Sequence, residues 1–178
     1  MGENVYFLVL RYNGLKEEVF KYVFDTIKRY KSVDVKAIYS IKWAESAKEE
    51  KLLSFYDHIK DEKAIEDIMK VNGTVMLGVI LYDNDPIPSK EETSGKNWHI
   101  IRIKRVIRGK FGNVVHLSDT EKLAYKQIKN LLGLSKKDVK PILESDSISI
   151  KEITTNHEAA TRMNKIKNGR EVLWSPKK

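Results

Sequence analysis

The sequence predicts an α+β sandwich, in which helices pack on one β-sheet. Strand-like runs alternate with segments of helical periodicity in the order β-α-β-α-β-α-β-α, without internal repeats. At 178 residues, the chain is long enough for one domain with a sizeable core. Hydrophobic residues make up 41% of it, whereas it has only four prolines and nine glycines. This composition excludes a disordered or low-complexity chain.

The start of the chain predicts two strands with a helix between them. Residues 5–10 form an apolar run that stops at the turn pair Asn13-Gly14, which is typical of a buried strand. Residues 15–30 carry apolar side chains at helical spacing, which indicates an amphipathic helix. Apolar and polar residues alternate over 33–43, so we expect a second strand with one face covered.

The middle of the chain predicts two helices, a central strand and a long loop. Residues 44–70 are charge-rich and favour two helices that are separated around residues 57–61. Residues 74–82 form an apolar run that is continuous enough to lie centrally in the sheet. A long loop over 83–95 then leads to a helix whose inner side carries Ile100, Ile103 and Ile107.

One more strand and helix complete the predicted domain, which spans residues 1–134. Residues 113–116 read as the strand. Ser118 and Glu121 have the spacing of a capping box, in which each side chain bonds the other residue's backbone amide. Gly133 is a good C-terminal cap for the helix that follows.

The remaining residues, 135–178, form a predicted C-terminal extension. A short lysine-rich segment opens it, and an alternating segment follows over 147–153. We expect a helix within residues 154–167.

The charge and residue-type composition narrows the classes of function. Lys and Arg number 33 against 25 Asp and Glu, which gives a net charge of +8, and the pI is about 9.4. Such a basic protein favours an anionic partner. Cysteine is absent, so disulfides, thiolate metal sites and cysteine nucleophiles are excluded. The apolar runs are too short to span a bilayer, and the N-terminus shows no signal-peptide pattern, so we expect a cytoplasmic protein without a membrane partner.

Six of the 33 basic residues lie between positions 96 and 110, a span without any acidic residue. Such a cluster is either a solvated helix face or an anion-binding site, and the sequence leaves both open. The six residues are Lys96, Arg102, Lys104, Arg105, Arg108 and Lys110.

Among the four histidines, only His116 has a suggestive setting. His58, His99 and His157 lie in polar surroundings, and we interpret each as a surface residue or one incidental to the function. His116 ends a strand-like run and precedes a predicted helix start, where a helix dipole and nearby arginines would keep its ring neutral and nucleophilic. A purely structural histidine remains the alternative.

Residues 108–121 carry a resemblance to a known family. They read Arg-Gly-Lys-Phe-Gly-Asn-Val-Val-His-Leu-Ser-Asp-Thr-Glu. This is similar to the active-site stretch of nucleoside diphosphate kinases, where Arg-Gly-Asp-Phe leads to Asn-x-x-His-Gly-Ser-Asp-Ser-x-Glu. Weaker likeness covers about residues 5–134, including 7–14 and 72–75. The resemblance implies a ferredoxin-like fold.

The resemblance also implies catalytic roles. In the family, a histidine takes the γ-phosphoryl group of a nucleoside triphosphate and passes it to a diphosphate. By position, His116 would be that nucleophile, and Tyr56 and Ser118 would support its surroundings. Gln127 stands where the family has a glutamate that orients the imidazole.

Nucleotide binding is implied for a second set of residues. Arg108 would contact phosphates, Arg11 stands where the family has a lysine, and Asn113 would bind the sugar. Arg102 and Arg105 are further candidates for nucleotide contacts. The resemblance adds Mg²⁺ as a cofactor that arrives with the nucleotide, no metal site in the protein itself, and a homo-oligomer.

Several departures from the family pattern keep a second hypothesis open. Leu117 replaces the glycine beside the histidine, Gln127 replaces an acid, and the link from Arg108 to His116 is shorter than in the family. We therefore expect a divergent phosphotransferase, or else an inactive module of the same fold that binds nucleotide or nucleic acid. A purely structural, partner-binding role is the third possibility.

Overall fold

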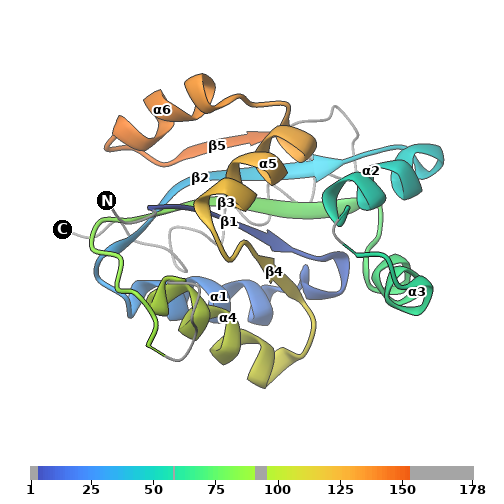
Figure 1. The fold of residues 1–178 in the computed structure, drawn as a ribbon, viewed down its shortest axis with the longest axis horizontal. Coiled ribbons are helices and arrows are strands. Elements are labelled where there is room, and N and C mark those ends of the chain that lie inside the picture. Colours follow the sequence, from blue (N-terminus) through green and yellow to red (C-terminus); the bar gives the residue numbers. More distant parts are fainter. Residues whose placement is uncertain (1–3, 58, 91–95, 153–178) are drawn as a thin grey trace.

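The computed structural model describes residues 4–57, 59–90 and 96–152. It contains one five-stranded sheet in the order β4-β1-β3-β2-β5, with β3 in the middle (Figure 1). Neighbouring strands are antiparallel, except that β5 is parallel to β2. This confirms the predicted α+β sandwich and the central place of the third strand. The strands are β1 (Val5–Leu10), β2 (Val33–Lys42), β3 (Val75–Asp83), β4 (Val115–Leu117) and β5 (Ser149–Glu152).

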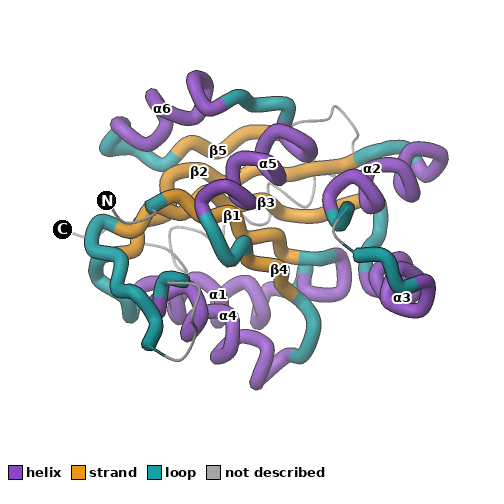
Figure 2. Tube along the Cα trace, viewed as in Figure 1, coloured by secondary structure: helices purple, strands orange, loops and turns teal. Residues whose placement is uncertain are grey.

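The helices cover both faces of the sheet. Figure 2 shows α1 and α4 on one side, and α2, α5 and α6 on the other, while α3 lies beyond the end of the sheet. None of the described helices has the length and apolar character needed to cross a membrane. The helices are α1 (Glu17–Lys28), α2 (Lys48–Phe55), α3 (Glu62–Val71), α4 (Trp98–Phe111), α5 (Glu121–Leu132) and α6 (Lys136–Glu144).

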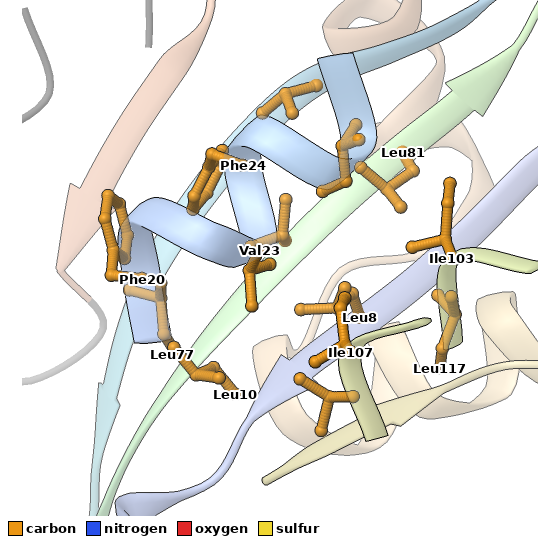
Figure 3. Packing of buried hydrophobic residues seen from close by; sticks show 14 of the residues in the cluster. Leu8, Leu10, Phe20, Val23, Phe24, Leu77, Leu81, Ile103, Ile107 and Leu117 are labelled. Carbon is orange, nitrogen blue, oxygen red and sulfur yellow. The ribbon is translucent and has the colours of Figure 1, made fainter. Parts of the chain in front are cut away.

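The first core lies between the sheet and the pair α1 and α4. The apolar side of α1 packs here at the spacing that the sequence predicts, with Val23, Phe24 and Ile27 fully buried (Figure 3). Ile103 and Ile107 of α4 complete this layer. Truncating Phe24 to alanine would cost about 3–5 kcal/mol of stability, because its large side chain leaves a cavity.

The second core lies on the opposite face, under α2, α5 and α6. Phe55 of α2, Ile128 of α5 and Val139 of α6 are buried there. The alternation along β4 decides which core each of its residues faces. Val115 and Leu117 belong to the first core, so His116 between them faces the side of α2 and α5.

The prediction of one covered face for the second strand is wrong. The register between β2 and β3 shifts between Val35 and Ala37, which marks a β-bulge. A bulge adds one residue and reverses the faces beyond it. Val33 and Val35 therefore pack in the first core, whereas Ala37 and Tyr39 pack in the second.

The predicted capping box at the start of α5 is also wrong. Thr120, not Ser118, is the N-cap, and its Oγ1 accepts the amide of Leu123. Ser118 Oγ instead accepts the amide of Phe7 at 2.9 Å, in the buried interior. The predicted end at Gly133 is confirmed, since this residue adopts φ +69°, a conformation that favours glycine.

Residues beyond 134 continue the same fold: they form a helix that packs on the sheet and a strand that joins it. Ser135 and Asp138 form a capping box at the start of α6. Val139 is fully buried, and β5 pairs with β2. The boundary after residue 134 stays a prediction, and the helix expected within residues 154–167 lies outside the described residues.

Candidate functional site

His116 lies on the edge strand β4, opposite Val9 of β1. Its imidazole lies edge-on to the rings of Phe55, the last residue of α2, and of Tyr56, which follows it, at centroid distances of 5.0 and 5.5 Å. The Nε2 atom lies 3.1 Å from Oε1 and 2.9 Å from Nε2 of the buried Gln127 on α5. The structure thus brings His116, Gln127 and Tyr56 together.

Arg11 connects this group to the end of α4. Arg11 is buried, with only 3% of the residue exposed. Nε and Nη2 donate to the hydroxyl of Tyr56 at 3.1 and 3.0 Å, and Nη1 donates to the carbonyl and the side-chain oxygen of Asn113. The guanidinium therefore holds α2 and the loop before β4 beside His116. We call Arg11, Phe55, Tyr56, Asn113, His116 and Gln127 the histidine cluster.

The surroundings keep His116 neutral at ordinary pH. Burial is the main cause that lowers the pKa of His116, from 6.5 to about 3. The positive charges of Arg11, Lys104 and Arg108 lower the pKa further, while the hydrogen bond with Gln127 raises it. A neutral ring keeps a lone pair on one nitrogen, as a nucleophile requires.

Gln127 determines which nitrogen carries that lone pair. If its Oε1 accepts from Nε2–H, the lone pair is on Nδ1, which hydrogen-bonds to no described residue. If its amide donates to Nε2 instead, Nδ1 carries the proton. A glutamate would fix the first state because a carboxylate only accepts, whereas the amide permits both.

A second group of residues forms an open pocket beside β4. Its volume is about 480 Å³. Ile101, Lys104, Arg105 and Arg108 recur at helical spacing on one side of α4, and this spacing brings them to a common wall. We call the following lining residues the cationic pocket: Lys96, Ile101, Lys104, Arg105, Arg108, Gly109 and Asp119.

Asp119, in the turn between β4 and α5, supplies a carboxylate to this pocket. It pairs with Lys104 and, at 3.8 Å, with Lys96. Burial alone would raise the pKa of Asp119, but the two lysines lower it below its ordinary value. The span of residues 96–110 is free of acids in the sequence, yet the fold provides it with a counter-ion.

The cationic pocket and the histidine cluster both border β4. Arg108 donates through Nε and Nη2 to the carbonyl of Val115, at 3.2 and 3.0 Å. Burial and the nearby charge of Arg11 lower the pKa of Arg108. Lys104 approaches the carbonyl of Leu117 at 3.4 Å. The cations that line the pocket are thus anchored to the strand that carries His116.

Two predicted site residues lie outside these groups. The guanidinium of Arg102 stacks over the ring of Trp98, 5.5 Å from its centroid, and Arg102 does not line the pocket. Ser118 bonds the amide of Phe7 and connects β1 to the turn after β4. Both assignments, like the other predicted roles in binding and catalysis, stay predictions.

His99 is not a surface residue, which contradicts one of the two interpretations that the sequence allows. Its side chain is 15% exposed, and Nδ1 lies 2.8 Å from a carboxylate oxygen of the fully buried Asp83. Burial would raise the pKa of Asp83, but hydrogen bonds from Asn97, Ser32 and His99 lower it. This pair joins the end of β3 to the start of α4. His58 and His157 lie outside the described residues.

The donor set of the site does not fit a metal ion held by protein ligands. No group of three or more His, Cys, Asp or Glu side chains with suitable placement occurs among the described residues. The carboxylate in the cationic pocket, Asp119, already pairs with two lysines. A Mg²⁺ ion here would depend on the phosphates of a bound nucleotide for its ligands.

Sequence reasoning missed Phe55 and Asp119 as parts of the site. Phe55 lies directly before Tyr56, and the helical pattern of residues 48–55 marks it as apolar core. In the sequence, Asp119 belongs to the motif around His116, but nothing there assigns it a role of its own. Its pairing with Lys104 joins different elements, so no local signal could reveal it.

Comparison with known proteins identifies the fold. No protein-family model matches the chain, and a search of curated proteins finds no match. Among solved structures, the nucleoside diphosphate kinase of Aquifex aeolicus is similar with a TM-score of 0.51 and 15% identity, covering 75% of this chain and 96% of that one. The enzyme from Encephalitozoon cuniculi gives 0.50 and 16%, covering 78% and 99%. These similarities confirm the ferredoxin-like fold of nucleoside diphosphate kinases.

Proposed function

We propose, from a fold shared with nucleoside diphosphate kinases, that this protein is a divergent phosphotransferase. It binds a nucleoside triphosphate through the cationic pocket and accepts the terminal phosphoryl group on His116. One observation carries the proposal: a neutral imidazole, held at Nε2 by Gln127, lies within the electrostatic reach of Arg11, Lys104 and Arg108. Neutral imidazole and clustered cations are what transfer to a histidine requires.

The chemical step follows from the tautomer that Gln127 permits. With Nε2–H donated to Gln127 Oε1, the lone pair of Nδ1 attacks the γ-phosphorus. The N–P bond forms as the bond to the bridging oxygen breaks, and the nucleoside diphosphate leaves with that oxygen. A second nucleoside diphosphate then takes the phosphoryl group in the reverse step, which restores neutral His116.

The residues divide this work between binding and positioning. Lys104, Arg105 and Arg108 line the pocket, where they would neutralise the phosphate oxygens. Arg11 uses its donors on Tyr56 and Asn113, so we assign it the positioning of these residues and the neutrality of His116. Mg²⁺ would enter with the nucleotide.

Phosphorylation of His116 tests the proposal. Incubation with ATP labelled at the γ-phosphate should give an acid-labile, base-stable label on the wild-type protein, and a diphosphate acceptor should remove it. His116→Ala should take up no label, whereas His99→Gln should label like the wild type, since His99 pairs with Asp83 and does not line the pocket. A wild-type protein that remains unlabelled would overturn the proposed activity.

A catalytically inactive nucleotide-binding module is the second candidate. It is favoured by the two aromatic rings against His116, which leave less room for a phosphoryl group beside the imidazole. In this case, ATP would raise the melting temperature of wild type and His116→Ala alike, without labelling either. We do not extend this candidate to nucleic acid, because four of the six basic residues between positions 96 and 110 line a single pocket.

A further inference from the structure

The cationic pocket already holds an anionic group of its own. Both carboxylate oxygens of Asp119 are used: Oδ1 pairs with Lys104 and Oδ2 lies 3.8 Å from Nζ of Lys96. All three residues line the pocket. The side chain of Asp119 is 36% exposed, and that of Lys104 is 18% exposed. A phosphate group that reached Lys104 and Lys96 would meet this carboxylate first.

We propose that Asp119 is a built-in competitor for the phosphate-binding lysines, which restricts the pocket to terminal phosphates that carry two charges. This inference rests on the proposed binding of phosphate in the pocket. It adds a specificity-determining residue and a substrate class: phosphate monoesters and polyphosphate ends are accepted, and phosphodiesters are excluded.

The charges of the competing groups explain the selection. A carboxylate and a phosphodiester each carry one negative charge, so exchanging one for the other at two lysines gains little Coulomb energy. A terminal phosphate carries about −1.5 to −2 at neutral pH and offers three oxygens instead of two. The Coulomb energy of a terminal phosphate at the two lysines therefore offsets the loss of their ion pairs with Asp119. Arg105 and Arg108 line the pocket as further cations.

The local structure allows the carboxylate of Asp119 to move away from Lys104 and Lys96 without unfolding α5. Thr120 caps this helix through the amide of Leu123. Glu121 accepts the amides of Asn4 and Val5, which fixes the first turn of the helix to β1. Ser118 is held by the amide of Phe7. The residues on either side of Asp119 thus hold the turn, and its own contacts in the pocket are those with the lysines.

Binding of pyrophosphate to the full chain tests the inference. Isothermal titration calorimetry at low salt, without divalent cations, should show that Asp119→Asn binds pyrophosphate about fivefold more tightly than the wild type, which is the upper end of the effect of a partly exposed ion pair. Asp119→Glu should bind like the wild type. The matched control is Asp67→Asn, which removes an exposed carboxylate paired with Lys70 on α3 and should change nothing.

A diester probe tests the selection itself. A dinucleotide with one internal phosphodiester and no terminal phosphate should bind the wild type at least tenfold more weakly than pyrophosphate does. Equal affinity for the two probes would overturn the substrate class. Unchanged or weaker pyrophosphate binding by Asp119→Asn, or no binding by either protein, would overturn the competition. Repeating the titrations in His116→Ala separates this result from the proposed transfer, because pyrophosphate binding in the pocket does not require the histidine.

Discussion

The histidine cluster and the cationic pocket border the same edge strand but follow opposite principles. In the cluster, a buried Arg11 is fully engaged with Tyr56 and Asn113, and aromatic rings pack around the imidazole. In the pocket, lysines and arginines surround an open space, and the two lysines share one carboxylate. Burial fixes a neutral group in place in the cluster, while the pocket keeps charged side chains beside an open space. The cluster thus depends on its packing, and the pocket depends on its charge.

Acid should destabilise the protein through the cluster, and this is the largest expected effect. The pKa of His116 is lowered from 6.5 to about 3, so the unfolded chain binds a proton more readily than the folded protein. The stability that the neutral ring provides is complete above pH 6.5 and decreases as the pH falls towards 3, by about 1.4 kcal/mol per pH unit. Urea unfolding at pH 7 and pH 4.5 should show this decrease.

His116→Asn is the comparison for that pH profile. This variant has no imidazole to titrate, so its loss of stability between pH 7 and 4.5 should be smaller by about 1.4 kcal/mol for each unit below 6.5. Parallel profiles for the two proteins would contradict the burial of a neutral ring in the cluster.

Replacing Arg11 should also affect stability more than binding. Arg11→Met leaves the hydroxyl of Tyr56 and the carbonyl of Asn113 without their donor, which should cost about 3 kcal/mol. It also removes the charge that most lowers the pKa of His116, so this pKa should rise in an NMR titration. Arg102→Met is the matched control, because the exposed Arg102 stacks on Trp98 outside both groups. Equal stability losses in the two variants would show that Arg11 has no special part in the cluster.

Replacing Arg108 should have a smaller effect, on binding. Arg108→Met removes one cation from the pocket wall, and the affinity for ATP should fall about tenfold, as expected for the loss of one charge-assisted hydrogen bond of about 1.5 kcal/mol. Arg102→Met should retain wild-type affinity. Calorimetric titration measures both, and thermal unfolding confirms that the variants are folded. An affinity loss in Arg102→Met that matched that of Arg108→Met would place the phosphates elsewhere.

The fold could be predicted wherever the signal is local. The apolar run of β1 and the helical spacing of Val23 and Ile27 are properties of short segments, and the structure confirms both elements. The bulge between Val35 and Ala37 could not be predicted, because it arises from the pairing of β2 with β3. Ser118 and Thr120 are both suitable N-caps for α5. The buried amide of Phe7 donates to Ser118, so Thr120 caps the helix, and the sequence does not reveal this long-range contact.

The candidate site could be predicted only in part. The resemblance around His116 placed Gln127 beside the imidazole, and the structure has the two side chains in contact. The separation of Arg102 from the pocket, and the pairing of Lys104 with Asp119, depend on which side of α4 faces β4. Chain spacing does not determine that orientation by itself.

The anchoring of Arg108 and Lys104 to β4 has a consequence for solubility. The carbonyl oxygens of Val115 and Leu117 lie on a strand at the edge of the sheet, where unpaired carbonyls offer a template for another chain. Two positively charged side chains occupy these acceptors, and a second molecule that approached this edge would meet their charge and bulk. The side chains that we assign to phosphate recognition thus also protect the molecule against aggregation by strand addition.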